Sequence, residues 1–349
     1  MRLGVIPENL IERILLALGV LPTPIMDTMM AYTLARTIMV GTKLGVFEAL
    51  APGALTTGEV AKYCGTHPGA TKKLLNALAG AGYLRADGER YALAPVTRKW
   101  LLKESPQSLH DKMLFQFLEW DWMGHYEDFV RSGKPLDAHE TMSDDEWGLY
   151  QQGMRSAVSM WASEVARRTP VPKGARDMLD IGGSHGYYSV ALCRRHPSLR
   201  AVVLDLPEAV KQAAPILAKE GMGDRVVHRA GNALTDDLGT KAWDLVFIAL
   251  VVHHFDEATN RELAQRVALS LRPGGVFVIQ ETIRPHSPKE AGQLGALLDL
   301  YFAVTSEAGS WSFEDMAAWQ REAGLVPQKP IRFRSVPGTG QQVAVKPSA

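Results

Sequence analysis

Apolar runs and amphipathic stretches alternate along the second half of the chain. The apolar runs lie near residues 177–181, 201–205, 225–229, 243–250 and 275–281, and helical periodicity fills the gaps between them. Strands that alternate with helices form a parallel sheet with helices on both faces. The tail from Ile331 to Val345 is interrupted at Pro337-Gly338-Thr339-Gly340 and predicts a closing antiparallel hairpin. The pattern predicts an α/β fold with a doubly wound, Rossmann-like domain.

The first 43 residues show a helical pattern instead. Apolar residues recur at helical spacing from Ile11 to Val20, two prolines follow, and a second helix is predicted from Met26 to Lys43. Such stripes pair with a second subunit or pack within the same chain. We expect the first, in a homodimer.

Residues 43–102 combine helices with a hairpin. Thr56 is placed to cap a helix with Glu59 three residues later, and another helix is predicted from Pro68 to Ala81. The turn Asp87-Gly88 then joins two short strands. Helix, turn, helix and hairpin make a winged helix, which suits either DNA binding or dimerisation. The candidate recognition helix offers two lysines and little else to read bases, which favours dimerisation.

The segment 105–170 reads as helical and is rich in aromatic residues and methionine. Side chains of this kind form either a core or the wall of an apolar pocket for a flat substrate, and both interpretations remain open for each residue. We divide the chain into a dimerisation domain at 1–104, a helical linker and substrate-pocket segment at 105–170, and the doubly wound domain at 171–349. The aromatic residues of the middle segment are Phe115, Phe117, Trp120, Trp122, Tyr126, Phe129, Trp147, Tyr150 and Trp161.

Composition narrows the choice of partners. The 38 basic residues balance the 38 acidic ones, so net charge provides no attraction to nucleic acid or to an anionic membrane. Cys64 and Cys193 are far apart and form no metal or redox motif, which indicates a reducing compartment. The apolar stretch from Ile11 to Val20 contains two charges and is too short to span a bilayer. We expect a cytoplasmic protein that binds neither nucleic acid nor membrane and holds no metal.

The most informative motif is the turn from Asp180 to Gly186, which reads Asp-Ile-Gly-Gly-Ser-His-Gly. It follows a predicted strand and precedes a predicted helix, so its glycines allow a ligand to approach the backbone at a helix N-terminus. Asp205 ends the next strand, where an acid accepts hydrogen bonds from ribose. The turn is tighter than the dinucleotide fingerprint, and no phosphate-binding lysine follows. A nucleoside without phosphates, as in S-adenosylmethionine, fits better than NAD.

Polar side chains also follow the later strands of the predicted sheet. Asn232 comes after the third strand, His253 and His254 after the fourth, and Glu281 ends the fifth. Ligands of open α/β sheets bind beyond these strand ends. The amide of Asn232 could accept from the amine of adenine, and one histidine beside a carboxylate makes a candidate general base. His254 should matter little if its side chain turns away from the pocket.

The chain from about residue 25 onward resembles the two-domain class I S-adenosylmethionine-dependent O-methyltransferases, which include plant caffeate and flavonoid enzymes, acetylserotonin methyltransferase and bacterial natural-product enzymes. The resemblance implies a homodimer that methylates a hydroxyl of a small aromatic or polyketide-like metabolite and releases S-adenosylhomocysteine. Methylation of carbon or nitrogen, a reaction without methyl transfer, and a winged-helix regulator remain alternatives. The matching segments are 179–183, 204–207, 231–232, 252–255, 272–275 and 280–281.

Specific roles also follow from the resemblance. It implies that His253 is the base, that Glu281 orients it, and that Glu307 is a candidate for the second orienting carboxylate, although Ser310 stands at the expected position. Ser184 replaces a glycine, and His254-Phe255 replaces Asp-Trp. The implied cofactor-binding residues are Asp180, Gly182, Gly183, Ser184, Gly186, Asp205, Leu206, Asn232 and Ala233.

Overall fold

The structure is a computed structural model that describes residues 3–136, 138–306, 309–336 and 338–348. The chain divides into two compact units, Met1–Phe117 and Leu118–Ala349, with the boundary inside helix α8 (His110–Met123). No helix among the described residues is long and apolar enough to cross a membrane.

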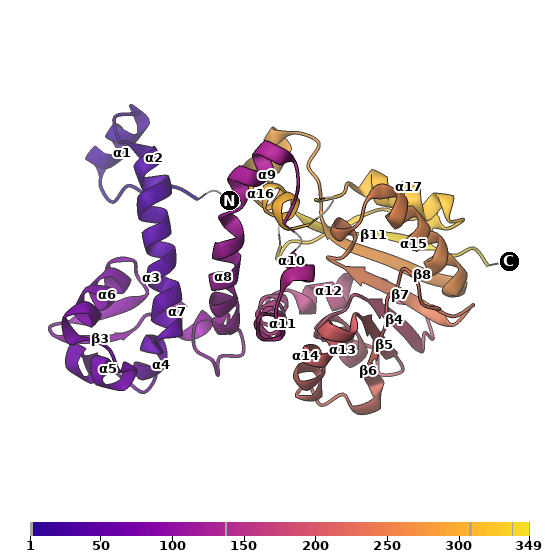
Figure 1. Ribbon diagram of the computed structural model, residues 1–349, viewed down its shortest axis with the longest axis horizontal. Coiled ribbons are helices and arrows are strands. Elements are labelled where there is room, and N and C mark those ends of the chain that lie inside the picture. Colours follow the sequence, from indigo (N-terminus) through magenta and orange to yellow (C-terminus); the bar gives the residue numbers. More distant parts are fainter. Residues whose placement is uncertain (1–2, 137, 307–308, 337, 349) are drawn as a thin grey trace. The chain divides into compact units, whose positions relative to one another are not determined.

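The first unit is helical with a small sheet (Figure 1). Strand β3 lies between β1 and β2, antiparallel to both. The Thr56–Glu59 capping box and the Asp87-Gly88 hairpin are present as predicted. Helices α5 and α6 and this hairpin form a winged helix around a core that includes Phe47 and Leu75. The elements are α1 (Leu10–Ala17), α2 (Thr23–Ile25), η1 (Met26–Met30), α3 (Ala31–Lys43), α4 (Val46–Ala49), β1 (Leu55–Thr56), α5 (Thr57–Cys64), α6 (Pro68–Gly80), β2 (Leu84–Asp87), β3 (Arg90–Leu93) and α7 (Pro95–Trp100).

The second unit is built on a sheet with strand order β10-β11-β8-β7-β4-β5-β6. The five strands from β8 to β6 run parallel, β11 is antiparallel to β8, and β9 pairs with β11. The predicted closing hairpin is present as β10 and β11, while its Pro337 lies outside the described residues. The strands are β4 (Asp177–Ile181), β5 (Arg200–Asp205), β6 (Val226–Ala230), β7 (Trp243–Ala249), β8 (Leu271–Thr282), β9 (Val326–Pro327), β10 (Ile331–Arg332) and β11 (Thr339–Val345).

Helices cover both faces of this sheet (Figure 1). Along β7, Leu245 and Phe247 pack with α12 and α13, whereas Val246 and Ile248 pack with α15 and α17. This alternation buries both faces, and it confirms the predicted doubly wound α/β fold. The helices are α9 (Tyr126–Ser132), α10 (Ala138–Thr141), α11 (Asp144–Val158), α12 (Ala162–Arg168), α13 (Tyr187–Arg195), α14 (Pro207–Ala218), η2 (Gly223–Arg225), η3 (Val252–His254), α15 (Glu257–Ser270), α16 (Pro288–Thr305) and α17 (Phe313–Glu322).

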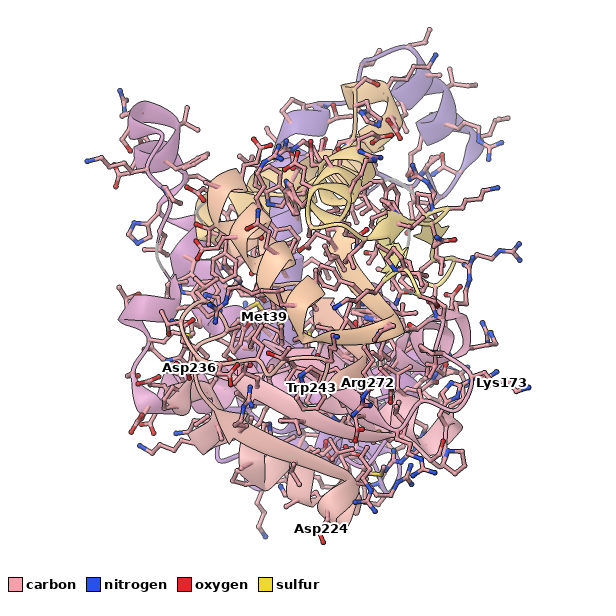
Figure 2. All side chains as sticks on the ribbon, turned by 90° about the vertical axis from the view of Figure 1, so that its right-hand side faces the viewer. Met39, Lys173, Asp224, Asp236, Trp243 and Arg272 are labelled. Atoms are coloured by element: carbon pink, nitrogen blue, oxygen red, sulfur yellow. The ribbon has the colours of Figure 1, made fainter. Side chains whose placement is uncertain are left out.

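The two ends of the sheet differ in chemistry. At the amino end, Arg272 contacts Asp177 at 2.8 Å and Asp244 at 2.9 Å. Figure 2 shows Arg272 beside Trp243, where β7 and β8 begin. These charges satisfy one another, so they stabilise the edge of the sheet. The opposite, carboxyl end carries the polar side chains that the sequence singles out.

Candidate functional site

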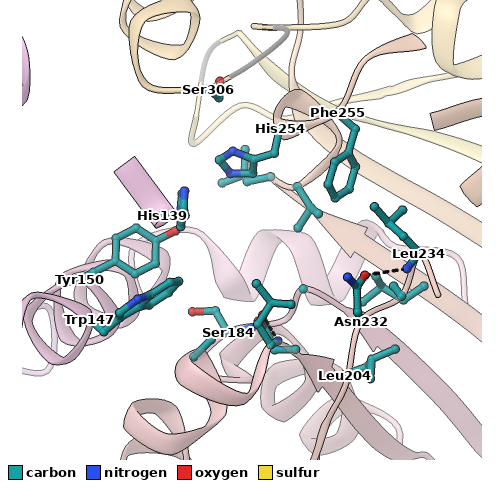
Figure 3. Close-up of a pocket in the computed structure, with 18 of the residues that line it drawn as sticks. His139, Trp147, Tyr150, Ser184, Leu204, Asn232, Leu234, His254, Phe255 and Ser306 are labelled. Atoms are coloured by element: carbon teal, nitrogen blue, oxygen red, sulfur yellow. Dashed lines mark hydrogen bonds between the residues drawn. The ribbon is translucent and has the colours of Figure 1, made fainter. Parts of the chain in front are cut away.

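A cavity of about 640 Å³ lies beyond the carboxyl ends of β4, β5 and β7 (Figure 3). Asn232 and Leu234 lie on one side of it, and His139, Trp147 and Tyr150 on the other. Among the described lining residues, Asp205 is the one acidic residue, and none is a lysine or an arginine. The site therefore suits a nucleoside without phosphates together with an uncharged, flat partner.

The predicted glycine turn follows β4 as expected and brings the backbone to the cavity. A Cβ on Gly182, whose φ is +63°, would lie 2.5 Å from a Val251 methyl group, and one on Gly183 would lie 2.6 Å from the Asp180 carboxyl carbon. Only glycine fits both positions. Gly182 and Ser184 line the cavity, whereas Gly183 and Gly186 support the turn without appearing among the described lining residues.

Asp180 lies beneath this turn and does not belong to the described lining residues. It is almost fully buried, and its Oδ2 accepts a hydrogen bond of 2.6 Å from the Ser189 hydroxyl. Burial raises the pKa of Asp180 to about 7. Its position indicates that it shapes the turn from below.

Asp205 and its neighbours form the next part of the cavity wall. Asp205 Oδ2 accepts from the Ser184 N–H at 2.7 Å, and Oδ1 accepts from the Leu206 N–H at 2.8 Å. Burial raises the pKa of this carboxyl, and the two backbone donors oppose the shift. Each oxygen keeps a further lone pair for a ligand hydroxyl.

Asn232 and Ala233 also line the cavity, as does Leu206. The Asn232 side-chain oxygen accepts from the Leu234 N–H at 2.9 Å (Figure 3). The Asn232 N–H donates to Asp236 at 3.0 Å. These bonds hold the loop after β6 in one conformation. The amide nitrogen of Asn232 and one lone pair of its oxygen remain available.

His253 and Glu281 meet as the sequence predicts. His253 Nδ1 lies 3.0 Å from both carboxylate oxygens of Glu281, and both side chains are buried. The turn that carries His253 is fixed because Trp311 Nε1 and Asn260 Nδ2 both donate to the Val252 carbonyl at 2.9 Å. His253 Nε2 makes no hydrogen bond within the described part of the chain.

His254 faces the cavity and does not turn away from it (Figure 3). Its ring centre is 4.2 Å from that of His253 and 4.5 Å from that of His139. Burial, and then the two neighbouring imidazoles, hold the pKa of His254 well below its ordinary value. His254 is therefore neutral near pH 7. The adjacent His253 is not among the described residues that line the cavity.

The remaining candidate residues either lie outside the described residues or have other contacts than predicted. Glu307 lies outside the described residues, and the hydroxyl of Ser310, which stands at the expected position of the second carboxylate, donates to Asp299. Of the aromatic residues in the middle segment, Trp147 and Tyr150 line the cavity. His139 and Gln151 also line the cavity, and no motif in the sequence marks either of them. Gln151 does follow Trp147 by one helical turn and so shares its face.

Two family profiles match the chain. The profile described as the O-methyltransferase domain matches residues 125–325, and that of the O-methyltransferase dimerisation domain matches residues 26–103. The first covers more than half of the 349 residues. The chain therefore belongs to the O-methyltransferase family, which confirms the predicted membership in the two-domain S-adenosylmethionine-dependent O-methyltransferases.

Individual proteins agree with this assignment. The chain is 26% identical over 337 residues to the 3-hydroxy-5-methyl-1-naphthoate 3-O-methyltransferase of Streptomyces sahachiroi, covering 93% of this chain and 95% of that protein. It is also 26% identical over 344 residues to the N,N-dimethyltransferase OxyT of Streptomyces rimosus, covering 91% and 94%. The structure of human N-acetylserotonin methyltransferase in complex with S-adenosylmethionine has the same fold, with a TM-score of 0.82, 20% identity, and coverage of 97% and 99%.

The residues present fit S-adenosylmethionine. The glycine turn leaves room where a Cβ would collide with Val251, and the Asp205 carboxylate is fixed with lone pairs to spare. The absence of lysine and arginine from the described lining suits a cofactor that carries no phosphate and has a positive sulfur.

Proposed function

We propose that the protein transfers a methyl group from S-adenosylmethionine to a hydroxyl of a small aromatic or polyketide-like molecule, with His253 as general base. The bound cofactor supplies an electrophilic methyl group on a sulfonium. The observation that carries the proposal is the pairing of His253 with Glu281, with contacts of 3.0 Å. The His253 ring centre lies 4.2 Å from that of His254, which lines the cavity.

The cofactor-binding residues have different roles in this proposal. Asp205 would bind the ribose hydroxyls through its free lone pairs, and Asn232 and Ala233 would flank the adenine. The part of the cavity between the ribose and adenine sites would be lined by Leu206, Gly182 and Ser184. The conformation of the turn is maintained by Asp180, Gly183 and Gly186. Such fixed contacts contribute to catalysis by orientation, because an in-line displacement requires that the reacting atoms be aligned.

The hydrogen bond to Glu281 determines which nitrogen of His253 can act. Because the carboxylate accepts from Nδ1–H, the lone pair lies on Nε2, which can take a proton from the acceptor hydroxyl. A phenol with a pKa near 10 lies about 3.5 units above histidine, so full transfer before reaction would cost about 5 kcal/mol. Proton transfer concerted with methyl transfer avoids that full cost. Glu281 then stabilises the imidazolium.

His254 is the competing base, because it lines the cavity directly. Its ring makes only ring contacts within the described residues, with no carboxylate beside it. A proton arriving there would create a buried charge beside two imidazoles, which the lowered pKa already disfavours. We therefore assign the proton to His253 and a contact with the acceptor to His254.

The acceptor side of the cavity favours a flat, uncharged molecule. Trp147 and Tyr150 are in edge contact with centres 5.6 Å apart, and His139 packs against both. This wall offers stacking surface and neutral hydrogen-bonding groups. A flat aromatic acceptor, a hydroxynaphthoate, is named for the Streptomyces sahachiroi relative, and its fused ring system matches this stacking surface.

A product assay tests the proposal. The purified protein is incubated with S-adenosylmethionine and a panel of naphthols, hydroxynaphthoates and matched aromatic amines, and S-adenosylhomocysteine and methylated products are measured by mass spectrometry. Methyl ethers are expected. N-methylated products alone would instead match the named activity of the Streptomyces rimosus relative, and the absence of S-adenosylhomocysteine would reject methyl transfer.

We further propose that the protein is a cytoplasmic homodimer. The match to a dimerisation domain and the exposed apolar residues of α1 and η1 support the assembly.

A further inference from the structure

Ser184 occupies a backbone conformation that glycine adopts more easily. Its φ is +54°, within the left-handed region, and it stands where the related turn has glycine. A residue with a Cβ is disfavoured there by roughly a factor of ten relative to the right-handed region. Something in the surroundings must therefore hold Ser184 in place.

Three side chains from three elements hold it. The Ser184 N–H donates to Asp205 at the end of β5 at 2.7 Å, and its carbonyl contacts His228 Nε2 on β6 at 2.8 Å. Its hydroxyl donates to the side-chain oxygen of Gln151 on α11. The first two contacts use the backbone and would survive replacement by glycine, but the third depends on the serine side chain.

Gln151 is an unusual partner. It is 1% exposed and lines the cavity, and its amide nitrogen has no hydrogen-bond partner within the described residues. A buried amide without a partner destabilises the folded state, so such a group needs an explanation. Among the described residues, the hydrogen bond from Ser184 is what joins the Gln151 side chain to the cofactor turn.

The helix that carries Gln151 also forms the acceptor wall. Trp147 and Tyr150 lie on α11 within one turn of Gln151, and both line the cavity (Figure 3). The Ser184–Gln151 bond therefore joins the cofactor turn to the surface that would receive the acceptor. While they make this bond, Ser184 keeps a left-handed φ and Gln151 keeps a buried amide nitrogen without a hydrogen-bond partner among the described residues.

We propose that Ser184 and Gln151 are positioning residues that couple the two halves of the site. Cofactor contacts at the turn and at Asp205 stabilise the left-handed conformation of Ser184. Through its hydrogen bond to Gln151, Ser184 then holds α11 in position, so that Trp147 and Tyr150 are oriented to bind the acceptor. By reciprocity, an acceptor held by α11 raises the affinity for the cofactor by the same factor. This inference rests on the cofactor site proposed above.

Hydrogen exchange of the full-length protein tests the coupling, with S-adenosylhomocysteine as the probe. Peptides from the turn (180–188) and from α11 (144–158) are followed with and without saturating probe, and affinity is measured by calorimetry. The variants are Ser184→Gly, which suits the backbone and removes the hydroxyl, and Gln151→Met, which removes the amide. Gln152→Met is the matched control, because its side chain is exposed on the same helix.

In the wild type, the probe should slow exchange in both segments. Ser184→Gly and Gln151→Met should bind it about 2- to 10-fold more weakly and keep protection of the turn, but they should lose the added protection of α11. The double variant should lose no more affinity than either single one.

Retained protection of α11 in both variants, at saturation, would overturn the coupling while leaving the cofactor site intact. Equal loss in Gln152→Met would overturn it as well, since the helix would then respond to any change. If the wild type does not bind the probe, the cofactor site itself fails, and the coupling fails with it.

Discussion

Asp205 is the residue on which cofactor binding should depend most. Both carboxylate oxygens are already fixed by backbone N–H groups, so they can receive ribose hydroxyls without further loss of side-chain freedom. Hydrogen bonds to a charged group contribute about 1.5–3 kcal/mol each. We predict that Asp205→Ala weakens S-adenosylmethionine binding at least tenfold by calorimetry. Glu208→Ala, which removes an exposed carboxylate nearby, should bind normally. Unchanged affinity in folded Asp205→Ala would refute the assignment.

His253 and His254 should differ in which kinetic constant they control. If His253 takes the proton, His253→Ala should lower kcat about 10²- to 10⁴-fold with cofactor affinity nearly unchanged. Glu281→Gln should lose less, because it keeps a group that orients the ring. His254→Ala should chiefly raise KM for the acceptor. Steady-state kinetics distinguishes the two histidines. If only His254→Ala strongly lowered kcat, the general base would be His254 and not His253.

His185 makes the turn sensitive to acid. It is buried, its Nδ1 accepts from the Tyr187 N–H at 3.1 Å, and burial lowers its pKa to about 3 from an ordinary value of 6.5. The unfolded chain therefore binds the extra proton between these values. The stability from His185 is complete above pH 6.5 and is lost as pH falls, by about 2 kcal/mol at pH 5.

The variant His185→Asn isolates this contribution. Its side-chain oxygen can still accept from Tyr187 but cannot be protonated in this range, so its urea stability should fall less than that of the wild type between pH 7 and pH 5. Asp180, with a raised pKa, acts in the opposite direction in both proteins and cancels in the comparison. Parallel curves for the two proteins would exclude His185 as the sensitive group.

At the scale of elements, the turn between β4 and α13 tolerates few side-chain substitutions. Alanine at position 182 would place its Cβ 2.5 Å from a Val251 methyl group, in addition to a φ of +63°. We predict that Gly182→Ala weakens cofactor binding, and that Val251→Ala in the same chain recovers part of the loss by removing the collision. The backbone strain of about 1 kcal/mol should remain. No recovery in the double variant would mean that strain alone governs the turn.

Elements whose pattern is local were predictable, and those placed by packing were not. The strands β4 to β7 follow from short apolar runs, and the turn after β4 follows from its glycines. Strand β8 begins at Leu271, earlier than its apolar run, because Leu271 pairs with Trp243 across an irregular register. His139 and Gln151 could not be assigned, because only the packing of α10 and α11 brings them to the strand ends.

At the scale of the whole molecule, the first unit exposes several large apolar residues near its N-terminus. Leu10, Ile11 and Leu18 are 70–71% exposed, and Met26 and Met29 of η1 are also exposed. Patches of this kind mark interaction sites. Neutral net charge and the dimerisation profile at residues 26–103 direct the interpretation toward a second copy rather than DNA.

We therefore predict a stable dimer at micromolar concentration by light scattering. Ile11→Asp combined with Leu18→Asp should shift the protein toward monomer, because burying two carboxylates at an apolar interface is costly. Arg13→Glu on the same helix is the control, since its exposed, charged side chain should leave assembly unchanged. A wild-type monomer would reject the dimer. A dimer that persists in the double variant would place the interface on residues other than those of α1.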